Sequence, residues 1–180
     1  MENIDLSEFI TQAQAGQADS FGRLYDHFSQ PIFRFIRAKV QGNEQAEDLL
    51  QETFIKAWRG LPTYRPQGGS FSGWLYRIAL NAVTDYYRKT GRSVQTVEIM
   101  ENVDLPAAEN QEQILDSAFD AENLRGLLNQ LSEKYRIVLE LRFLSDLSIQ
   151  ETAETLGKSE LAVRVLQHRA LKKLRQSAKK

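Results

Sequence analysis

The stretch SIQETAETLGKSELAVRVLQHRALKKLR, residues 148–175, predicts two helices joined by a short turn. Ser148, with Glu151 three residues later, has the pattern of a capping box, so we expect a helix to begin there. Gly157 is expected to end that helix, because glycine adopts the left-handed backbone conformation without a steric penalty. Ser159 is expected to cap the next helix, and two helices in this order form a helix-turn-helix.

The second of these helices separates apolar from basic side chains. Successive residues of an α-helix are about 100° apart, which places apolar residues on one face and basic or titratable residues on the opposite face. The apolar residues are Val163, Leu166, Ala170 and Leu174, and those opposite them are Arg164, His168, Lys172 and Arg175. No acidic residue follows Glu160. We expect the apolar face to close a small core and the basic face to bind an anionic partner.

Three interpretations of this basic face compete. A solvated surface helix usually mixes acids and bases four residues apart, and a membrane-surface helix has a broad apolar face with aromatic residues. The helix has neither pattern. We therefore favour the third interpretation, in which the helix lies in the major groove of DNA and its cations neutralise phosphates.

The predicted DNA contacts divide by side-chain chemistry. Arginine can form bidentate bonds to guanine, histidine can donate or accept, and valine can contact the methyl group of thymine, whereas lysines more often contact phosphates. The expected base-reading residues are Arg164, Val165, His168 and Arg169. The expected phosphate contacts are Lys172, Lys173 and Arg175.

A second stretch, GWLYRIALNAVTDYYRKTGR at residues 73–92, interleaves aromatic and cationic side chains. Such a surface can stack unpaired bases and follow a nucleic-acid backbone. Trp74 and Tyr86 lie on the apolar face of the predicted helix, so a place in the core is the competing interpretation for them. The residues expected outside that face are Tyr76, Asn81, Arg88 and Lys89.

The whole sequence predicts an all-α fold of two small helical domains. Apolar residues recur at helical spacing, and runs of alternating Val, Ile and Thr are missing, which argues against strands. Residues 96–122 carry 8 acids and no base, and such a run of like charge favours an extended segment. We expect domains at 1–92 and 123–180, joined by an acidic flexible linker at 93–122. Asn43 and either Ser70 or Ser72 are also expected to cap the helices that follow them, and further helices are expected over 124–131 and 132–144.

The composition argues against several kinds of site. The chain of 180 residues has no Cys and 2 His, so it offers no disulfide, no thiolate metal site and no cysteine nucleophile. It has no glycine-rich phosphate loop and no nucleophile–base pair, so we expect neither enzymatic activity nor a cofactor. The sequence has no signal-peptide pattern, and no apolar run approaches the roughly 20 residues of a membrane span. We expect a cytoplasmic protein that does not insert into a membrane.

Together these motifs resemble those of the extracytoplasmic-function (ECF) sigma factors of bacterial RNA polymerase, and the resemblance covers almost the whole chain. AEDLLQETFIKAW, residues 46–58, is similar to the segment of these proteins that binds the clamp helices of core RNA polymerase. FSGWLYRIALNAVTDYYRKTGR, residues 71–92, is similar to the helix that engages the minus-ten promoter element. Residues 124–175 are similar to the domain that reads the minus-thirty-five element.

The resemblance implies three partners, which are core RNA polymerase through its clamp and flap regions, promoter DNA, and an anti-sigma factor. The residues implied to bind the polymerase are Asp48, Gln51, Glu52, Phe54 and Trp58, and a place in the core is the competing interpretation for Phe54 and Trp58. Those expected at the minus-ten element are Tyr64, Tyr76, Arg77, Asn81, Arg88 and Lys89, of which Tyr64 and Asn81 would line a pocket for a flipped-out base. Those expected at the minus-thirty-five element are Ser159, Arg164, Val165, His168, Arg169, Lys172, Lys173 and Arg175.

The expected function is therefore that of a sigma factor, which directs core RNA polymerase to promoters and helps to hold the melted strand. The alternative is a free-standing helix-turn-helix regulator whose first domain senses a ligand or dimerises. That alternative leaves the aromatic and basic helix at residues 73–92 without a purpose. Binding to core RNA polymerase distinguishes the two.

Overall fold

The computed structural model describes residues 6–65, 70–91, 128 and 130–177. In these ranges every regular element is a helix, which confirms the predicted all-α class. The chain separates into two compact units, Met1–Val94 and Gln95–Lys180. The acidic linker predicted at 93–122 lies outside the described residues, so its bounds stay a prediction.

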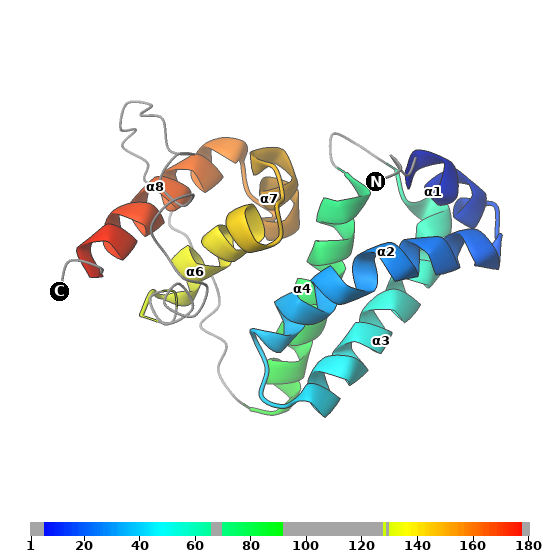
Figure 1. Cartoon of the computed structure of the whole chain (residues 1–180), viewed down its shortest axis with the longest axis horizontal. Helices are drawn as coiled ribbons and strands as arrows, with labels where there is room; N and C mark the ends of the chain where they lie inside the picture. Colours follow the sequence, from blue (N-terminus) through cyan, green and yellow to red (C-terminus); the bar gives the residue numbers. More distant parts are fainter. Residues whose placement is uncertain (1–5, 66–69, 92–127, 129, 178–180) are drawn as a thin grey trace. The chain divides into compact units, whose positions relative to one another are not determined.

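The described part of the N-terminal unit is a bundle of α-helices with one short 3-10 turn (Figure 1). Its elements are α1 (Leu6–Gln14), α2 (Ala18–Arg37), α3 (Asn43–Gly60), η1 (Leu61–Thr63) and α4 (Phe71–Lys89). Helix α2 packs against α1, α3 and α4, and α3 also packs against α4. The side chains buried between these helices include Leu24, Ile32 and Ile36 of α2 and Leu75 and Ala79 of α4.

Helices α3 and α4 are capped differently at their N-termini. Ser70 caps α4 as predicted, because its Oγ accepts a hydrogen bond from the Gly73 amide at 3.0 Å. Asn43 is the first residue of α3 rather than its cap, and the cap position belongs to Gly42, whose φ is 93°. Glycine adopts this φ without the strain that other residues incur. The Asn43 Oδ1 instead accepts from the Arg37 Nε at 2.7 Å, which ties the start of α3 to the end of α2.

The described part of the C-terminal unit contains α6 (Glu133–Leu139), η3 (Glu140–Leu144), α7 (Ile149–Leu156) and α8 (Glu160–Ser177). Helix α8 packs against both α6 and α7 (Figure 1). The single helix predicted over 132–144 is instead an α-helix that passes into a π-helix, where the Ser145 amide donates to the Glu140 carbonyl at 2.9 Å. The helix predicted over 124–131 lies largely outside the described residues.

The predicted helix-turn-helix is confirmed at both of its serine caps and at its glycine turn. The Ser148 Oγ accepts from the Glu151 amide at 3.1 Å, and the Glu151 carboxylate accepts from the Ser148 amide at 2.6 Å, so the capping box is complete. Gly157 ends α7 with φ 62° and ψ 39°, in the left-handed region. The Ser159 Oγ then accepts from the Ala162 amide at 3.2 Å in the first turn of α8. These local bonds set the course of the chain between the two helices.

Replacing Ser148 by alanine should destabilise the first turn of α7 by about 1 kcal/mol, because it removes the capping hydroxyl from the Glu151 amide. Amide hydrogen exchange of the full chain measures this as a loss of about fivefold in protection of the α7 amides. The control is Gln150→Ala, at an exposed position of the same helix. Unchanged protection in Ser148→Ala would show that the capping box does not stabilise α7.

Candidate nucleic-acid and protein interfaces

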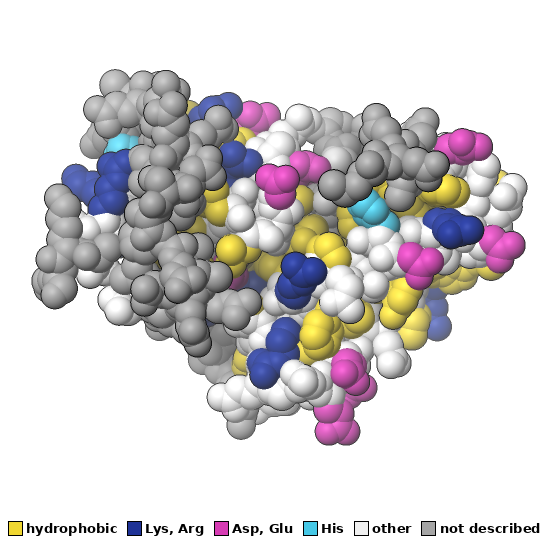
Figure 2. All heavy atoms as spheres, viewed as in Figure 1, with side chains coloured by type: hydrophobic (Ala, Val, Ile, Leu, Met, Phe, Trp, Pro, Cys, Tyr) yellow, Lys and Arg dark blue, Asp and Glu magenta, His cyan; other side chains and the backbone are white. Residues whose placement is uncertain are grey.

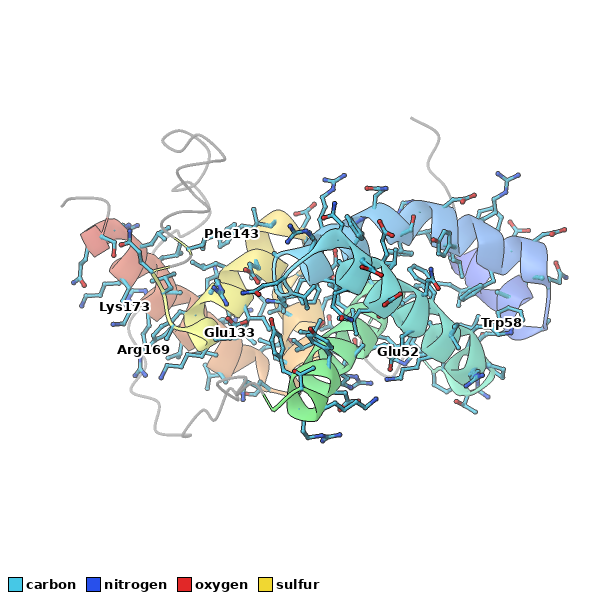
Figure 3. The ribbon with its side chains drawn as sticks, turned by 90° about the horizontal axis from the view of Figure 1, so that it is seen from below. Glu52, Trp58, Glu133, Phe143, Arg169 and Lys173 are labelled. Carbon is cyan, nitrogen blue, oxygen red and sulfur yellow. The ribbon has the colours of Figure 1, made fainter. Side chains whose placement is uncertain are left out.

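Helix α8 presents a basic face to the surface. Its five exposed cationic residues are Arg164, Arg169, Lys172, Lys173 and Arg175. His168 lies among them and is half-buried. Basic side chains gather over this helix in the space-filling view (Figure 2), and Figure 3 shows Arg169 and Lys173 projecting from it. The predicted basic face is therefore present, and the second helix of a helix-turn-helix carries it.

Two of these cations have neighbours that restrain them weakly. The Arg164 guanidinium lies 3.6 Å from the Glu160 carboxylate one turn earlier, and both side chains are more than half exposed. Exposed ion pairs of this kind contribute little to stability, so a phosphate or base can replace the carboxylate at low cost. The Lys173 Nζ lies 5.7 Å from the centre of the Tyr135 ring of α6.

Burial on α8 extends beyond the predicted apolar face and also reaches Val165, at the edge of the basic face. The four predicted core residues are buried, and so are Val165, Gln167 and Leu171. The prediction that Val165 contacts a thymine methyl group is wrong for this arrangement, because its side chain is only 5% exposed. A helical wheel describes one helix and leaves out whatever packs against it from the rest of the chain, and this omission explains the error.

Arg142 and Gln167, which were not among the predicted site residues, hold α8 to the segment before the helix-turn-helix. The Arg142 Nε donates to the Oε1 of Gln167, which is 4% exposed, at 3.1 Å. The Arg142 Nη1 donates to the Leu147 carbonyl, just before α7. One guanidinium thus joins η3, the start of α7 and the middle of α8. A polar residue among the apolar positions of α8 is the sequence signal for such a contact.

Helix α4 presents four of its predicted nucleic-acid residues at the surface. These exposed residues are Arg77, Asn81, Arg88 and Lys89. The Arg88 Nη2 lies 2.9 Å from the Asp85 Oδ1, and the Lys56 Nζ of α3 lies 3.9 Å from the other oxygen of that carboxylate. Arg77, Asn81 and Arg88 therefore form a polar strip along α4, and Lys89 lies beside it at the end of the helix.

Tyr76 lies in the core instead of on this strip, so its predicted place outside the buried face is wrong. Its side chain is 2% exposed, and its ring meets the ring of Phe35 of α2 edge to face, with centroids 5.2 Å apart. The reason is again tertiary, because α2 packs over the part of α4 that carries Tyr76. Trp74 and Tyr86, for which a place in the core was the alternative, are half-buried.

Tyr64 is also buried, with 7% of its surface exposed, which does not fit a ring that lines an open pocket for a base. The ring packs against Trp74, with centroids 4.8 Å apart, and meets Phe71 edge to face at 5.8 Å. The Gln14 side chain of α1 fixes the backbone here, because its Nε2 donates to the carbonyls of Leu61 at 3.1 Å and Tyr64 at 2.8 Å. Tyr64 therefore supports the start of α4 from within the core.

Helix α3 carries the residues that the resemblance assigns to polymerase binding. Asp48 and Gln51 are exposed, and Glu52 is half-buried and forms an ion pair with Lys56 at 2.6 Å. Trp58 is 37% exposed and projects from α3 together with Glu52 (Figure 3). These four residues form a surface with two carboxylates, an amide and an indole.

Phe54 differs from the other residues of that set, because it is 5% exposed and belongs to the core. Its ring packs edge to face against Tyr25 and Phe21 of α2, with centroids 4.7 Å and 6.3 Å apart. Direct contact with a partner is therefore not available to it in this structure. Two large apolar residues near it are exposed, Tyr25 at 38% and Ile55 at 51%, and neither was predicted at the surface.

The described residues contain no group of three or more His, Cys, Asp or Glu side chains that could hold a metal ion. No helix in the described part of the chain is long and apolar enough to cross a membrane.

Comparison with known protein families matches both units. Residues 24–93 match the family Sigma-70 region 2, and residues 121–174 match the family Sigma-70, region 4. The first match covers most of α2 and all of α3 and α4, and the second covers α6, α7 and most of α8. The two matched segments therefore contain the polar strip of α4, the acidic surface of α3 and most of the basic face of α8.

Individual proteins are similar over most of the chain. The ECF RNA polymerase sigma factor BldN of Streptomyces coelicolor is 39% identical over 171 residues, which are 94% of this chain and 64% of BldN. The ECF RNA polymerase sigma factor SigX of Bacillus subtilis is 35% identical over 161 residues, 87% of this chain and 82% of SigX. A co-crystal structure of the sigma factor RpoE with the anti-sigma factor NepR from Bartonella quintana aligns with a TM-score of 0.64 and 25% identity, covering 88% of this chain and 96% of RpoE.

Proposed function

The chain belongs to the ECF sigma factors of the sigma-70 family, and on that premise we propose how its two units direct core RNA polymerase to a promoter. Sigma factors are the subunits that give RNA polymerase its promoter specificity. We infer that this protein is a DNA-binding subunit of the cytoplasm with no catalytic activity of its own. Polymerisation then belongs entirely to the core enzyme.

The observation that carries the proposal is the basic face of α8 on a complete helix-turn-helix. The second helix of this motif enters the major groove, where its early residues meet base edges and its later residues meet phosphates. Arg164, His168 and Arg169 are proposed to read bases at the minus-thirty-five element. The proposed backbone contacts are Ser159, Lys172, Lys173 and Arg175. Val165 is left out of this set because it is buried.

The N-terminal unit is proposed to act at the minus-ten element through the polar strip of α4. Arg77, Arg88 and Lys89 would follow the phosphates of the melted strand, and Asn81 would bond to an exposed base edge, which becomes readable only when the base leaves the duplex. All four side chains are exposed, which supports these roles. Tyr64 and Tyr76 contribute through the core that positions α4.

The acidic surface of α3 is proposed to bind the clamp helices of core RNA polymerase. Asp48 and Glu52 lie one turn apart on the same side of the helix, and opposite charges across an interface guide association and exclude wrong partners. Gln51 and the exposed part of Trp58 add a hydrogen-bonding group and apolar area. Phe54 is buried against α2 and supports this surface by holding α3 in place.

An anti-sigma factor is proposed as a regulatory partner. The similar RpoE is seen in complex with the anti-sigma factor NepR, and a protein that covered the acidic surface of α3 or the basic face of α8 would block polymerase or promoter binding. The flap region of the polymerase is proposed as a further contact of the C-terminal unit.

Run-off transcription with core RNA polymerase tests the function, using promoter fragments selected from random DNA by the mixture of core and this protein. We expect specific transcripts only when the protein is present. The alternative regulator would fail to bind the core and would bind a palindromic duplex tightly by itself. That result would exclude the sigma-factor function for this chain.

Two substitutions on α8 should separate positioning from base reading. Lys172→Ala should weaken promoter binding about equally for all sequences and reduce the slope of log K against log salt by roughly 1, because it removes one phosphate contact. Arg164→Ala should cost about 1–3 kcal/mol at one base pair and relax the preference there. Binding titrations of the holoenzyme on a set of single-base promoter variants measure both. Equal, sequence-independent losses would remove Arg164 from the base-reading residues.

A further inference from the structure

We propose that Leu161 is a base-reading residue of α8 and that it contacts the methyl group of a thymine in the minus-thirty-five element. The inference rests on the proposed function, since it requires α8 to lie in the major groove. It assigns to Leu161 the apolar contact that the sequence predicts for Val165.

The exposure of Leu161 sets it apart from the other large apolar residues of α8. Its side chain is 46% exposed, whereas Val163 is 0% exposed and Leu166, Leu171 and Leu174 are each below 5%. A single exposed leucine is common on protein surfaces and needs no explanation by itself. Its position on the helix is what gives this one a role.

Leu161 lies in the first turn of α8, at the centre of the basic face. Arg164 is three residues further along and His168 is seven, so both lie on the same side of the helix as Leu161. Lys172 is eleven residues after Leu161, so the two residues lie only about 20° apart around the helix axis. In a helix-turn-helix, the N-terminal residues of the second helix are the ones that contact base edges. A helix placed so that Arg164 reads a base therefore also brings Leu161 to the floor of the groove.

The chemistry of the groove limits what a leucine can recognise there. Its side chain neither donates nor accepts hydrogen bonds, and a buried base-edge donor or acceptor left without a partner costs free energy. Thymine is the base that offers an apolar group in the major groove, the methyl group on C5. Contact with that methyl removes apolar surface of both partners from water. The proposed ligand is thus one thymine within the duplex minus-thirty-five element.

Replacing thymine by deoxyuridine tests this contact, because the exchange removes only the methyl group. The minus-thirty-five element is first identified on the selected promoters, and each thymine in it is then changed in turn. Wild-type holoenzyme should bind about three to five times more weakly when one particular thymine is replaced, which is the effect expected for one buried methyl group. Leu161→Ala holoenzyme should bind the thymine and deoxyuridine versions equally, and Leu161→Met should retain part of the difference.

The control variant is Leu144→Ala, which removes a leucine that is 54% exposed in the same unit but lies in η3, outside α8. It should keep the wild-type difference between thymine and deoxyuridine. The inference is overturned if Leu161→Ala keeps that difference too, or if wild-type holoenzyme does not distinguish the two bases at any position. Wild-type protein that directs no transcription with core polymerase would instead overturn the proposed function, so the two failures are distinguishable.

Discussion

Replacing Tyr76 by alanine is expected to lower the free energy of unfolding of the N-terminal unit by about 3–5 kcal/mol, the cost typical of truncating a buried aromatic side chain. The tyrosine is 2% exposed and fills the space between α4 and Phe35 of α2. Its removal leaves a cavity and also ends the edge-to-face contact of the two rings. If the side chain were a surface DNA contact, its loss would instead change stability by only about 0.5 kcal/mol.

Urea unfolding of the full chain, followed by tryptophan fluorescence, measures this effect. The chain has 2 tryptophans, and both Trp58 and Trp74 lie in the N-terminal unit, so the signal reports on that unit. Arg77→Ala is the matched control, because Arg77 is the next residue of α4 and is exposed. It should leave the unfolding midpoint nearly unchanged. A Tyr76→Ala protein that unfolds at the wild-type urea concentration but binds single-stranded DNA more weakly would contradict this prediction. It would show that Tyr76 contacts nucleic acid directly.

Reversing two charges on α3 is expected to weaken binding to core RNA polymerase by about 100-fold or more. The variant Asp48→Lys with Glu52→Lys turns an acidic surface into a basic one, and like charges placed opposite each other in an interface cost several kcal/mol. Lys56, which pairs with Glu52 at 2.6 Å, would then repel its neighbour and add to the positive charge. The stability of the unit should change less than its affinity, because Asp48 is exposed and Glu52 is only half-buried.

Fluorescence anisotropy of labelled protein titrated with core RNA polymerase measures this affinity, and tryptophan fluorescence verifies that the variant is folded. The double variant Asp19→Lys with Asp26→Lys is the control, since both residues are exposed on α2, outside the acidic surface of α3, and their reversal changes the net charge by the same amount. It should bind nearly as tightly as the wild type. Equal losses in the control and the α3 double variant would mean that net charge, and not the acidic surface of α3, determines binding.

The helix-turn-helix could be predicted almost residue by residue, because its signals are local. The Ser148 and Ser159 hydroxyls bond to amides three residues away, and Gly157 takes a backbone conformation that depends on its own missing Cβ. The exposed cations of α8 could be predicted for a related reason, since charged side chains are seldom buried without a partner. The prediction that Asn43 caps α3 was wrong, because the Asn43 side chain bonds to Arg37 of the preceding helix and Gly42 takes the cap position.

The errors in which side chains are buried share one physical origin, which is packing against other elements of the chain. Tyr76 and Phe54 are buried because α2 brings Phe35, Tyr25 and Phe21 against them. A periodic pattern assigns such residues to a face of their own helix, but it contains no information on which neighbour covers that face. The same holds for Val165, which is buried, and for Leu161, which stays exposed on the same helix.

Local order along the chain was therefore readable from residue types, because caps, turns and helical periodicity depend on groups within about one helical turn of each other. The choice of which aromatic and apolar side chains remain at the surface was made by tertiary contacts, because burial depends on every element that packs nearby. In this protein that choice separates the residues that support the interfaces, Tyr64, Tyr76 and Phe54, from those that can reach a partner, Asn81, Trp58 and Leu161.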